Sequence, residues 1–115
     1  MSLADRKCVP CRGGVPPLTP EQIAPLRSEV PAWEVVRDQR LVREFRFRDF
    51  AWALQFVNRI GALAEEEGHH PELLLGYGRV RVEMWTHKID GLTESDFILV
   101  AKVDRLWQTA GGRVL

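Results

Sequence analysis

Two stretches of alternating apolar and polar residues, each followed by a stretch of helical periodicity, set the architecture of this 115-residue chain. Within residues 33–47 the apolar side chains recur at every second position, which predicts two strands that turn near residues 38–39. Residues 73–77 and 80–86 repeat the pattern, and we expect Gly78 to supply the positive φ of a tight turn. The chain therefore contains two predicted β-hairpins.

A helix is predicted before the first hairpin and after each hairpin. The first begins with the cap and capping-box residues at 19–22 and ends before Pro31, with Ile23 and Leu26 as its inner face. The second has Asp49 as N-cap and Gly68 as its stop. Its apolar face is expected to comprise Phe50, Ala53, Leu54, Val57, Ile60 and Ala64. The third opens at residues 93–96 and runs to 111–112, with a stripe of Leu99, Val103, Leu106 and Ala110.

The order α-β-β-α-β-β-α predicts an α+β fold. If both hairpins join, they form a four-stranded antiparallel sheet whose single apolar face needs the three helices as cover. Residues 1–18 contain prolines and glycines that interrupt every period, so we expect an N-terminal leader arm there and a single domain over residues 19–115.

Composition excludes several classes of function. Sixteen Lys and Arg residues balance sixteen Asp and Glu residues, which argues against binding to nucleic acid or to an anionic membrane. The longest apolar run, residues 97–101, is far shorter than the roughly 20 residues that span a bilayer, and the N-terminus lacks the apolar stretch of a signal peptide. We therefore expect a soluble, cytoplasmic protein.

Cys8 and Cys11 have C-x-x-C spacing in the leader. A redox pair and half of a zinc site are both conceivable, and two reduced thiols in an ordered arm are the simpler interpretation. A redox motif of the thioredoxin type opens a helix, whereas the residues after Cys11 begin no regular element.

All the histidines of the chain lie around the second hairpin. His69 and His70 follow the long helix, and Pro71 holds His70 extended, so the two adjacent imidazoles should project in different directions. His87 ends the last strand of the same hairpin, and folding could bring it toward the pair. The reference pKa of imidazole, about 6.5, is close to neutrality, so three imidazoles favour proton transfer. Two adjacent histidines are a poor zinc chelate, because neighbouring extended side chains diverge. A zinc site using the two cysteines and histidine remains the competing interpretation.

Carboxylates lie close to these histidines in the sequence. Residues 65–67 are three glutamates at a helix C-terminus, where the macrodipole disfavours negative charge. Glu65 stands four residues before His69 and could contact an imidazole, while a solvated acidic helix end is the simpler interpretation of the run. Asp96 is either a helix-dipole partner or, if it lies near His87, a functional carboxylate.

One combination of residues resembles a known signature, that of the pterin-4a-carbinolamine dehydratase family. The matching residues, all in register over 65–96, are Glu65-x-x-x-His69-His70-Pro71, Tyr77, Thr86-His87, Gly91-Leu92-Thr93 and Asp96. The resemblance implies four antiparallel strands with three helices on one side, assembled as a homodimer by sheet extension or as a homotetramer.

The resemblance also implies a reaction, the dehydration of a 4a-hydroxytetrahydropterin to the quinonoid dihydropterin, which serves tetrahydrobiopterin recycling beside an aromatic amino acid hydroxylase. The reaction needs an acid and a base and no cofactor or metal. Animal members also act as dimerisation cofactors of a transcription factor, so a non-catalytic pterin-binding or protein-interaction module is the alternative.

The family's roles carry over residue by residue. His69 and His87 are the implied acid–base pair, and His70 is implied to position the substrate. Glu65 and Asp96 match acidic positions that would orient or charge the imidazoles. Trp85 and Thr86 are expected beside the bound ring because they neighbour His87. Residues 73–75 are leucines where some animal members carry aromatic and polar residues, which bears on the pocket wall.

Overall fold

The computed structural model describes residues 2–9 and 15–109. A 3-10 turn, η1, precedes the first helix, and a second one, η2, follows the last strand. In chain order the elements are η1 (Leu3–Asp5), α1 (Pro20–Arg27), β1 (Glu34–Val36), β2 (Arg40–Arg46), α2 (Phe50–Glu67), β3 (Glu72–Gly76), β4 (Arg79–Met84), η2 (His87–Ile89) and α3 (Glu94–Thr109).

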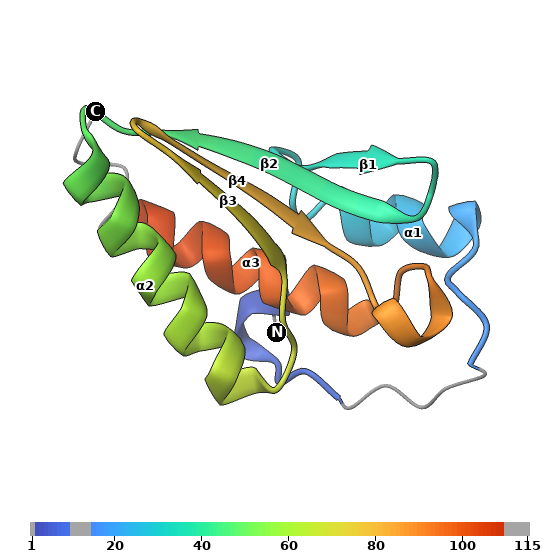
Figure 1. Cartoon of the computed structure of the whole chain (residues 1–115). Helices are drawn as coiled ribbons and strands as arrows, with labels where there is room; N and C mark the ends of the chain where they lie inside the picture. Colours follow the sequence, from blue (N-terminus) through green and yellow to red (C-terminus); the bar gives the residue numbers. More distant parts are fainter. Residues whose placement is uncertain (1, 10–14, 110–115) are drawn as a thin grey trace.

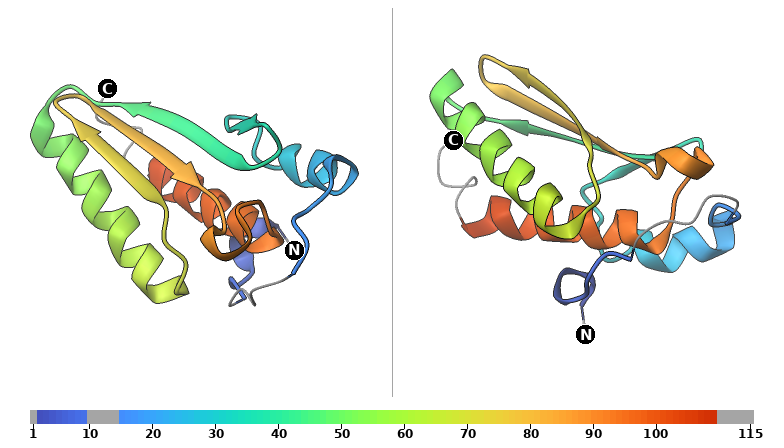
Figure 2. Two further views of the ribbon diagram at one scale, coloured as in Figure 1. Left: turned by 45° about the vertical axis from the view of Figure 1, so that its right-hand side comes forward. Right: turned by 60° about the horizontal axis from the view of Figure 1, so that its bottom comes forward.

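The strands form one antiparallel sheet in the order β1-β2-β4-β3. The two hairpins join through β2 and β4, whose register pairs Leu41 with Met84 and Arg46 with Arg79. All three α-helices lie on one side of this sheet (Figures 1 and 2). The predicted α+β fold, with its strand and helix order, is confirmed.

Local signals explain where the helices begin and end. Thr19 and Gln22 form a reciprocal capping box at the start of α1. The Asp49 side chain accepts a hydrogen bond from the Trp52 amide at the start of α2, and Gly68 closes that helix with φ of 66°. These predicted termini of α1 and α2 are therefore confirmed.

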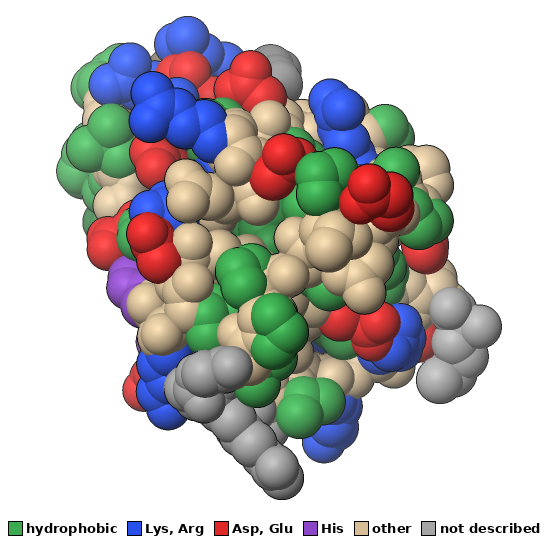
Figure 3. Space-filling view, turned by 90° about the vertical axis from the view of Figure 1, so that its right-hand side faces the viewer, with side chains coloured by type: hydrophobic (Ala, Val, Ile, Leu, Met, Phe, Trp, Pro, Cys, Tyr) green, Lys and Arg blue, Asp and Glu red, His purple; other side chains and the backbone are tan. Residues whose placement is uncertain are grey.

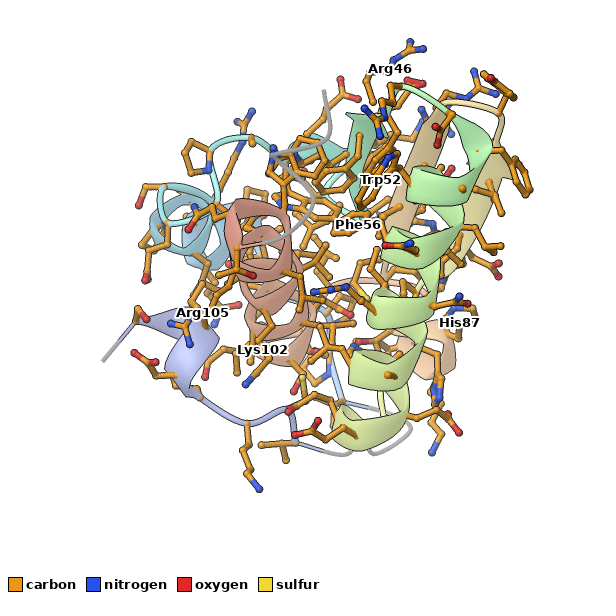
Figure 4. All side chains as sticks on the ribbon, turned by 90° about the vertical axis from the view of Figure 1, so that its left-hand side faces the viewer. Arg46, Trp52, Phe56, His87, Lys102 and Arg105 are labelled. Atoms are coloured by element: carbon orange, nitrogen blue, oxygen red, sulfur yellow. The ribbon has the colours of Figure 1, made fainter. Side chains whose placement is uncertain are left out.

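The core lies between the sheet and the helices. Four aromatic rings at one end pack edge-on or tilted at centroid separations of 4.9–5.7 Å, namely Phe45, Phe47, Phe56 and Trp107. Figure 4 shows Phe56 pointing from α2 into this space. The charged Arg43 also lies on the inner face of β2, where it pairs with Asp104 of α3 at 2.6 Å and stacks over Phe45. That ion pair accounts for the break in the apolar pattern.

Two details differ from the sequence-based predictions. The buried face of α2 is formed by Ala53, Phe56, Ile60 and Ala64, whereas Phe50 and Leu54 point outward and are 44% and 39% exposed. The prediction for those two residues was wrong because adjacent apolar stripes, 53-56-60-64 and 50-54-57, both have helical spacing.

The hairpin turns also differ. The first turn has positive φ at Arg37 and Asp38, one residue earlier than predicted. Gly78 does not adopt positive φ, so the predicted reason for a glycine in this turn was wrong. Glycine is required there because a Cβ would lie 2.6 Å from the Phe47 carbonyl oxygen.

The N-terminal arm, residues 2–9, packs along α3 (Figure 2). Leu3 is buried in the core, Asp5 pairs with Arg105, and the Val9 amide donates to Ser95 Oγ at 2.8 Å. Regular structure therefore begins earlier than expected from the leader's composition. Cys11, Ala110 and the predicted end of the last helix at 111–112 lie outside the described residues.

On the face seen in Figure 3, acidic and basic side chains are interspersed among apolar ones. Among the described residues, helices fall short of the length and apolar character that a membrane span needs.

Candidate active site

Two chain segments meet at the edge of the sheet where α2 ends. Glu72, the first residue of β3, pairs with Glu83 near the end of β4, so the segment before β3 and the segment after β4 lie side by side. Between them lies a hollow of about 370 Å³. Its lining consists of Gly68, His69, His70, Pro71, Glu72, Trp85, Thr86, His87 and Lys88. The structure thus brings all three histidines to one hollow, although 16 positions separate the first two from the third.

His69 is held by a buried carboxylate. Its Nε2 lies 2.6 Å from Oδ1 of Asp96, which is fully buried. If Nε2–H donates to Asp96, Nδ1 is the nitrogen that remains to exchange a proton with a ligand. In such a pair the carboxylate orients the imidazole and fixes which ring nitrogen carries the proton, as acid–base catalysis by histidine requires.

Asp96 is itself held at the start of α3. Its Oδ2 accepts a hydrogen bond from Thr86 Oγ1 at 2.8 Å and another from the Thr93 amide at 2.8 Å. The third position of a helix also favours negative charge. Asp96 therefore links the hydroxyl of Thr86, in one wall of the hollow, to His69 in the other. It contacts His69 rather than His87.

His70 pairs with the other predicted carboxylate. Its Nε2 lies 2.5 Å from Glu65 Oε2, and both side chains are exposed. Glu65 does not line the hollow and reaches it only through His70. The chain uses each of two acidic residues for one histidine, Asp96 beneath His69 and Glu65 beside His70.

His87 is held by a ring instead of a carboxylate. Its imidazole stacks on the indole of Trp85 with ring centroids 4.3 Å apart and ring planes 6° from parallel. The guanidinium carbon of Arg40 lies 4.1 Å from the same indole, and Arg40 Nη2 is 2.9 Å from Asp90 Oδ1.

Glu67 anchors the N-terminal arm next to the hollow. Its Oε1 accepts the amide hydrogen of Cys8 at 2.9 Å, and Lys102 Nζ lies 3.6 Å from Oε2. The amide of Cys8 lowers the pKa of Glu67 more than burial raises it, with a smaller contribution from Lys102. Burial, followed by the negative charge of Glu67, raises the pKa of the Cys8 thiol to about 12. Cys8 is therefore protonated near neutrality, which does not fit a reactive redox thiol.

Sequence reasoning missed several residues at or behind the hollow. Glu72 and Lys88 line it, Glu67 ties the arm to the helix end, and Arg40 stands behind Trp85. A strand register would have placed Arg40 opposite Trp85, because Leu41 pairs with Met84. For Glu67 the unfavourable run of glutamates was the only signal, and its partner lies 59 positions away.

Two further observations bear on alternative sites. Among the described residues, His, Cys, Asp and Glu do not form a group of three or more with the spacing of a metal site. A larger hollow, about 530 Å³, lies between the N-terminal arm and α3, with Arg43, Asp104 and Arg105 in its wall. That hollow contains none of the histidines.

The sequence is similar to known proteins of one family. The sequence model of the family described as "Pterin 4 alpha carbinolamine dehydratase" matches residues 16–106. A Rubrobacter xylanophilus protein named "Putative pterin-4-alpha-carbinolamine dehydratase" is 59% identical over 104 residues, covering 90% of this chain and 97% of that protein. A Rickettsia bellii protein of the same name is 54% identical over 106 residues, covering 91% and 94%.

Solved structures are similar as well. A crystal structure described as a transcriptional coactivator/pterin dehydratase from Brucella melitensis superposes with a TM-score of 0.73 and 31% identity, covering 78% of this chain and 97% of that one. A pterin dehydratase-like protein described as a RuBisCO assembly factor in the alpha-carboxysome gives a TM-score of 0.57 and 26% identity, covering 65% and 88%.

Proposed function

The chain belongs to the pterin-4a-carbinolamine dehydratase family, and on that premise we propose that it dehydrates a 4a-hydroxytetrahydropterin to the quinonoid dihydropterin. The observation that carries the proposal is the convergence of three imidazoles on one hollow of about 370 Å³. That volume lies in the range of small-molecule sites, toward the lower end. Imidazole is the side chain best suited to give and take protons near neutrality.

The proposed reaction needs one proton delivered and one removed. The bond between C4a and the hydroxyl oxygen breaks, and the oxygen leaves as water after an acid supplies a proton. The N5–H proton passes to a base, and the electrons of that N–H bond form the C4a=N5 double bond. The acid and the base are thus the only groups the chemistry requires from the protein.

We assign the acid–base pair to His69 and His87, because they enter the hollow from two different segments and can address two atoms of a flat ring. Asp96 orients His69 and stabilises positive charge on its ring. His70, paired with Glu65, positions the substrate at the solvent side. The hydroxyl of Thr86 and the indole of Trp85 complete the wall.

The direct test is a stopped-flow measurement of 4a-carbinolamine decay against the uncatalysed rate in buffer. His69→Ala and His87→Ala are expected to lower kcat by about 10²–10⁴ while retaining the circular dichroism of the wild type. Arg46→Met, on the open face of the sheet, serves as a control that leaves kcat unchanged. Folded histidine variants that dehydrate the substrate as fast as wild type would overturn the assignment.

A second candidate function is a pterin-binding or protein-interaction module without turnover. The exposed Phe50 and Leu54 on the outer face of α2 favour it, since they offer an apolar contact surface. The Brucella melitensis relative is described as a coactivator as well as a dehydratase. Pterin binding without acceleration of carbinolamine decay, together with a stable partner, would support this candidate over the dehydratase.

We also propose a homodimer or homotetramer acting in the cytoplasm, supplied with substrate by an aromatic amino acid hydroxylase. The edge strand β3 and the outer face of α2 are two surfaces that offer a self-contact. Light scattering that gives the mass of a monomer at micromolar concentration would contradict the assembly.

A further inference from the structure

We propose that Arg40 is a positioning residue for His87, acting through the indole of Trp85. The proposal rests on the proposed dehydratase function, in which His87 is one of the two groups that exchange a proton with the substrate. None of the sequence patterns at Arg40 points to this role. It follows from two contacts of the Arg40 side chain and from the strand register at that position.

The first contact is a three-layer stack. The guanidinium carbon of Arg40 lies 4.1 Å from the indole ring of Trp85, and the imidazole centroid of His87 lies 4.3 Å from it. At these separations the guanidinium and the imidazole each lie against the indole ring. The arrangement that avoids crowding between them places Arg40 and His87 on opposite faces of the indole, as a guanidinium–indole–imidazole stack.

The second contact ties Arg40 to the far end of the turn that carries His87. Arg40 Nη2 lies 2.9 Å from Asp90 Oδ1, and Asp90 closes η2 with φ of 47°. The Asp90 amide donates a hydrogen bond to the His87 carbonyl. Arg40 thus contacts the chain on both sides of His87, at Trp85 before it and at Asp90 after it.

The third observation is the sheet register, which places the backbone of Arg40 opposite Trp85. Leu41 pairs with Met84 in the β2–β4 ladder, so Arg40 and Trp85 follow as the next opposed positions on the outer face. The strand pairing thus holds the backbone of Arg40 close to Trp85 even before the side chains meet.

His87 needs such support more than the other two histidines. His69 and His70 each have a carboxylate partner, whereas the imidazole of His87 has neither a hydrogen bond nor an ion pair to any other part of the chain that the structure describes. His87 is also exposed and lies in a turn of three residues. Stacking on Trp85 is therefore what restricts its rotamer.

The stack changes the role available to Trp85. Both faces of its indole are occupied, so a flat substrate cannot stack on Trp85 while the three layers are intact. Trp85 then contributes to the wall of the hollow and serves as a spacer between Arg40 and His87. Loss of the guanidinium would free one face and allow the indole to rotate, carrying the imidazole with it.

The experiment compares two variants with one control. Arg40→Met removes the charge and the planar layer and keeps an aliphatic stem, while Asp90→Asn weakens the anchor by removing its negative charge and suits the positive φ. Arg46→Met makes the first change on the same strand and the same face, at the other end of β2. The readouts are the ring-proton shifts of His87 by NMR, which stacking on an indole moves upfield, and kcat and KM for carbinolamine dehydration.

We expect both Arg40→Met and Asp90→Asn to lose the upfield shift of the His87 ring protons and to lower kcat by about tenfold, with KM within twofold, because misplacement of a reacting group affects the chemical step. Arg40→Lys should recover part of kcat, and Arg46→Met should change neither readout. Unchanged His87 shifts or unchanged kcat in Arg40→Met would overturn the proposal. If the wild type does not accelerate the dehydration, the proposed function fails, and the NMR shifts still decide whether Arg40 holds the imidazole.

Discussion

Replacing Asp96 by Asn tests the pairing between His69 and the carboxylate beneath it. Asp96 is fully buried, with Oδ1 2.6 Å from His69 Nε2 and Oδ2 accepting hydrogen bonds from Thr86 and Thr93. The amide oxygen of Asn can keep the two threonine bonds, but its NH₂ group then faces His69. The imidazole must accept at Nε2 and carry its proton on Nδ1, the opposite tautomer.

The expected losses follow from that single change. A hydrogen bond to a charged group contributes about 1.5–3 kcal/mol and a neutral one about 0.5–1.5 kcal/mol, so Asp96→Asn should lower the free energy of unfolding by about 1–2 kcal/mol. For a domain of this size each kcal/mol corresponds to about 4 °C in Tm, which gives a decrease of about 4–8 °C. The wrong tautomer at an acid–base group should lower kcat by about 10²–10⁴. Calorimetry measures Tm, and stopped-flow decay of the carbinolamine measures kcat.

Asp104→Asn is the matched control on the same helix. Asp104 accepts from Trp33 Nε1 at 2.8 Å and pairs with Arg43 at 2.6 Å, remote from the histidines. This variant should lose stability and keep kcat. The reasoning is refuted if Asp96→Asn keeps kcat within twofold of wild type, or if Asp104→Asn loses as much activity.

Three further predictions concern the arm and the glycines. With a pKa near 12, Cys8 in a Cys11→Ser background should react with iodoacetamide at pH 8 about 10³-fold more slowly than an unfolded thiol; equal rates would contradict its burial. Because the folded state lowers the pKa of Glu67 below its ordinary 4.5, its stabilisation is complete above pH 4.5 and lost as pH falls through the folded value. Glu67→Gln should therefore be about 1 kcal/mol less stable at pH 7, and the difference in urea midpoint should close toward pH 3; a constant difference would refute the linkage. Gly78→Ala places a Cβ 2.6 Å from the Phe47 carbonyl oxygen and should lower the free energy of unfolding by about 1–3 kcal/mol. Gly61→Ala, where the Cβ meets no atom within 4 Å, should raise it by about 0.5–1 kcal/mol. Similar effects of both variants in thermal unfolding would be inconsistent with the close approach at Gly78.

The sequence determined the element order because each helix carries its own terminal signals. The capping residues Thr19 and Asp49 and the stop at Gly68 act within one turn of the residues they cap, so no tertiary information is needed to find them. The buried face of α2 was harder. Phe50 and Phe56 both belong to apolar stripes of helical spacing, and only the position of the sheet decides which stripe is covered.

The candidate site divides in the same way. The composition of residues 69–71 and 87 indicated acid–base chemistry, and their convergence could be proposed from the hairpin. The partner of Asp96 could not be derived, because its distance to His69 depends on how α3 packs against the end of α2. The contacts of Arg40 and Glu67 could not be predicted for the same reason, since their partners Trp85 and Cys8 come from other segments of the chain.

The most direct test of the account is to locate a bound pterin. Side-chain signals of histidine, tryptophan and arginine should be followed by NMR while an oxidised, unreactive pterin is titrated into the wild-type protein. We predict saturable shifts at His69, His70 and His87, with little change at Trp107 or Arg105, which line the larger hollow of about 530 Å³. Shifts confined to that larger hollow, with the three imidazoles unaffected at saturation, would contradict the central claim.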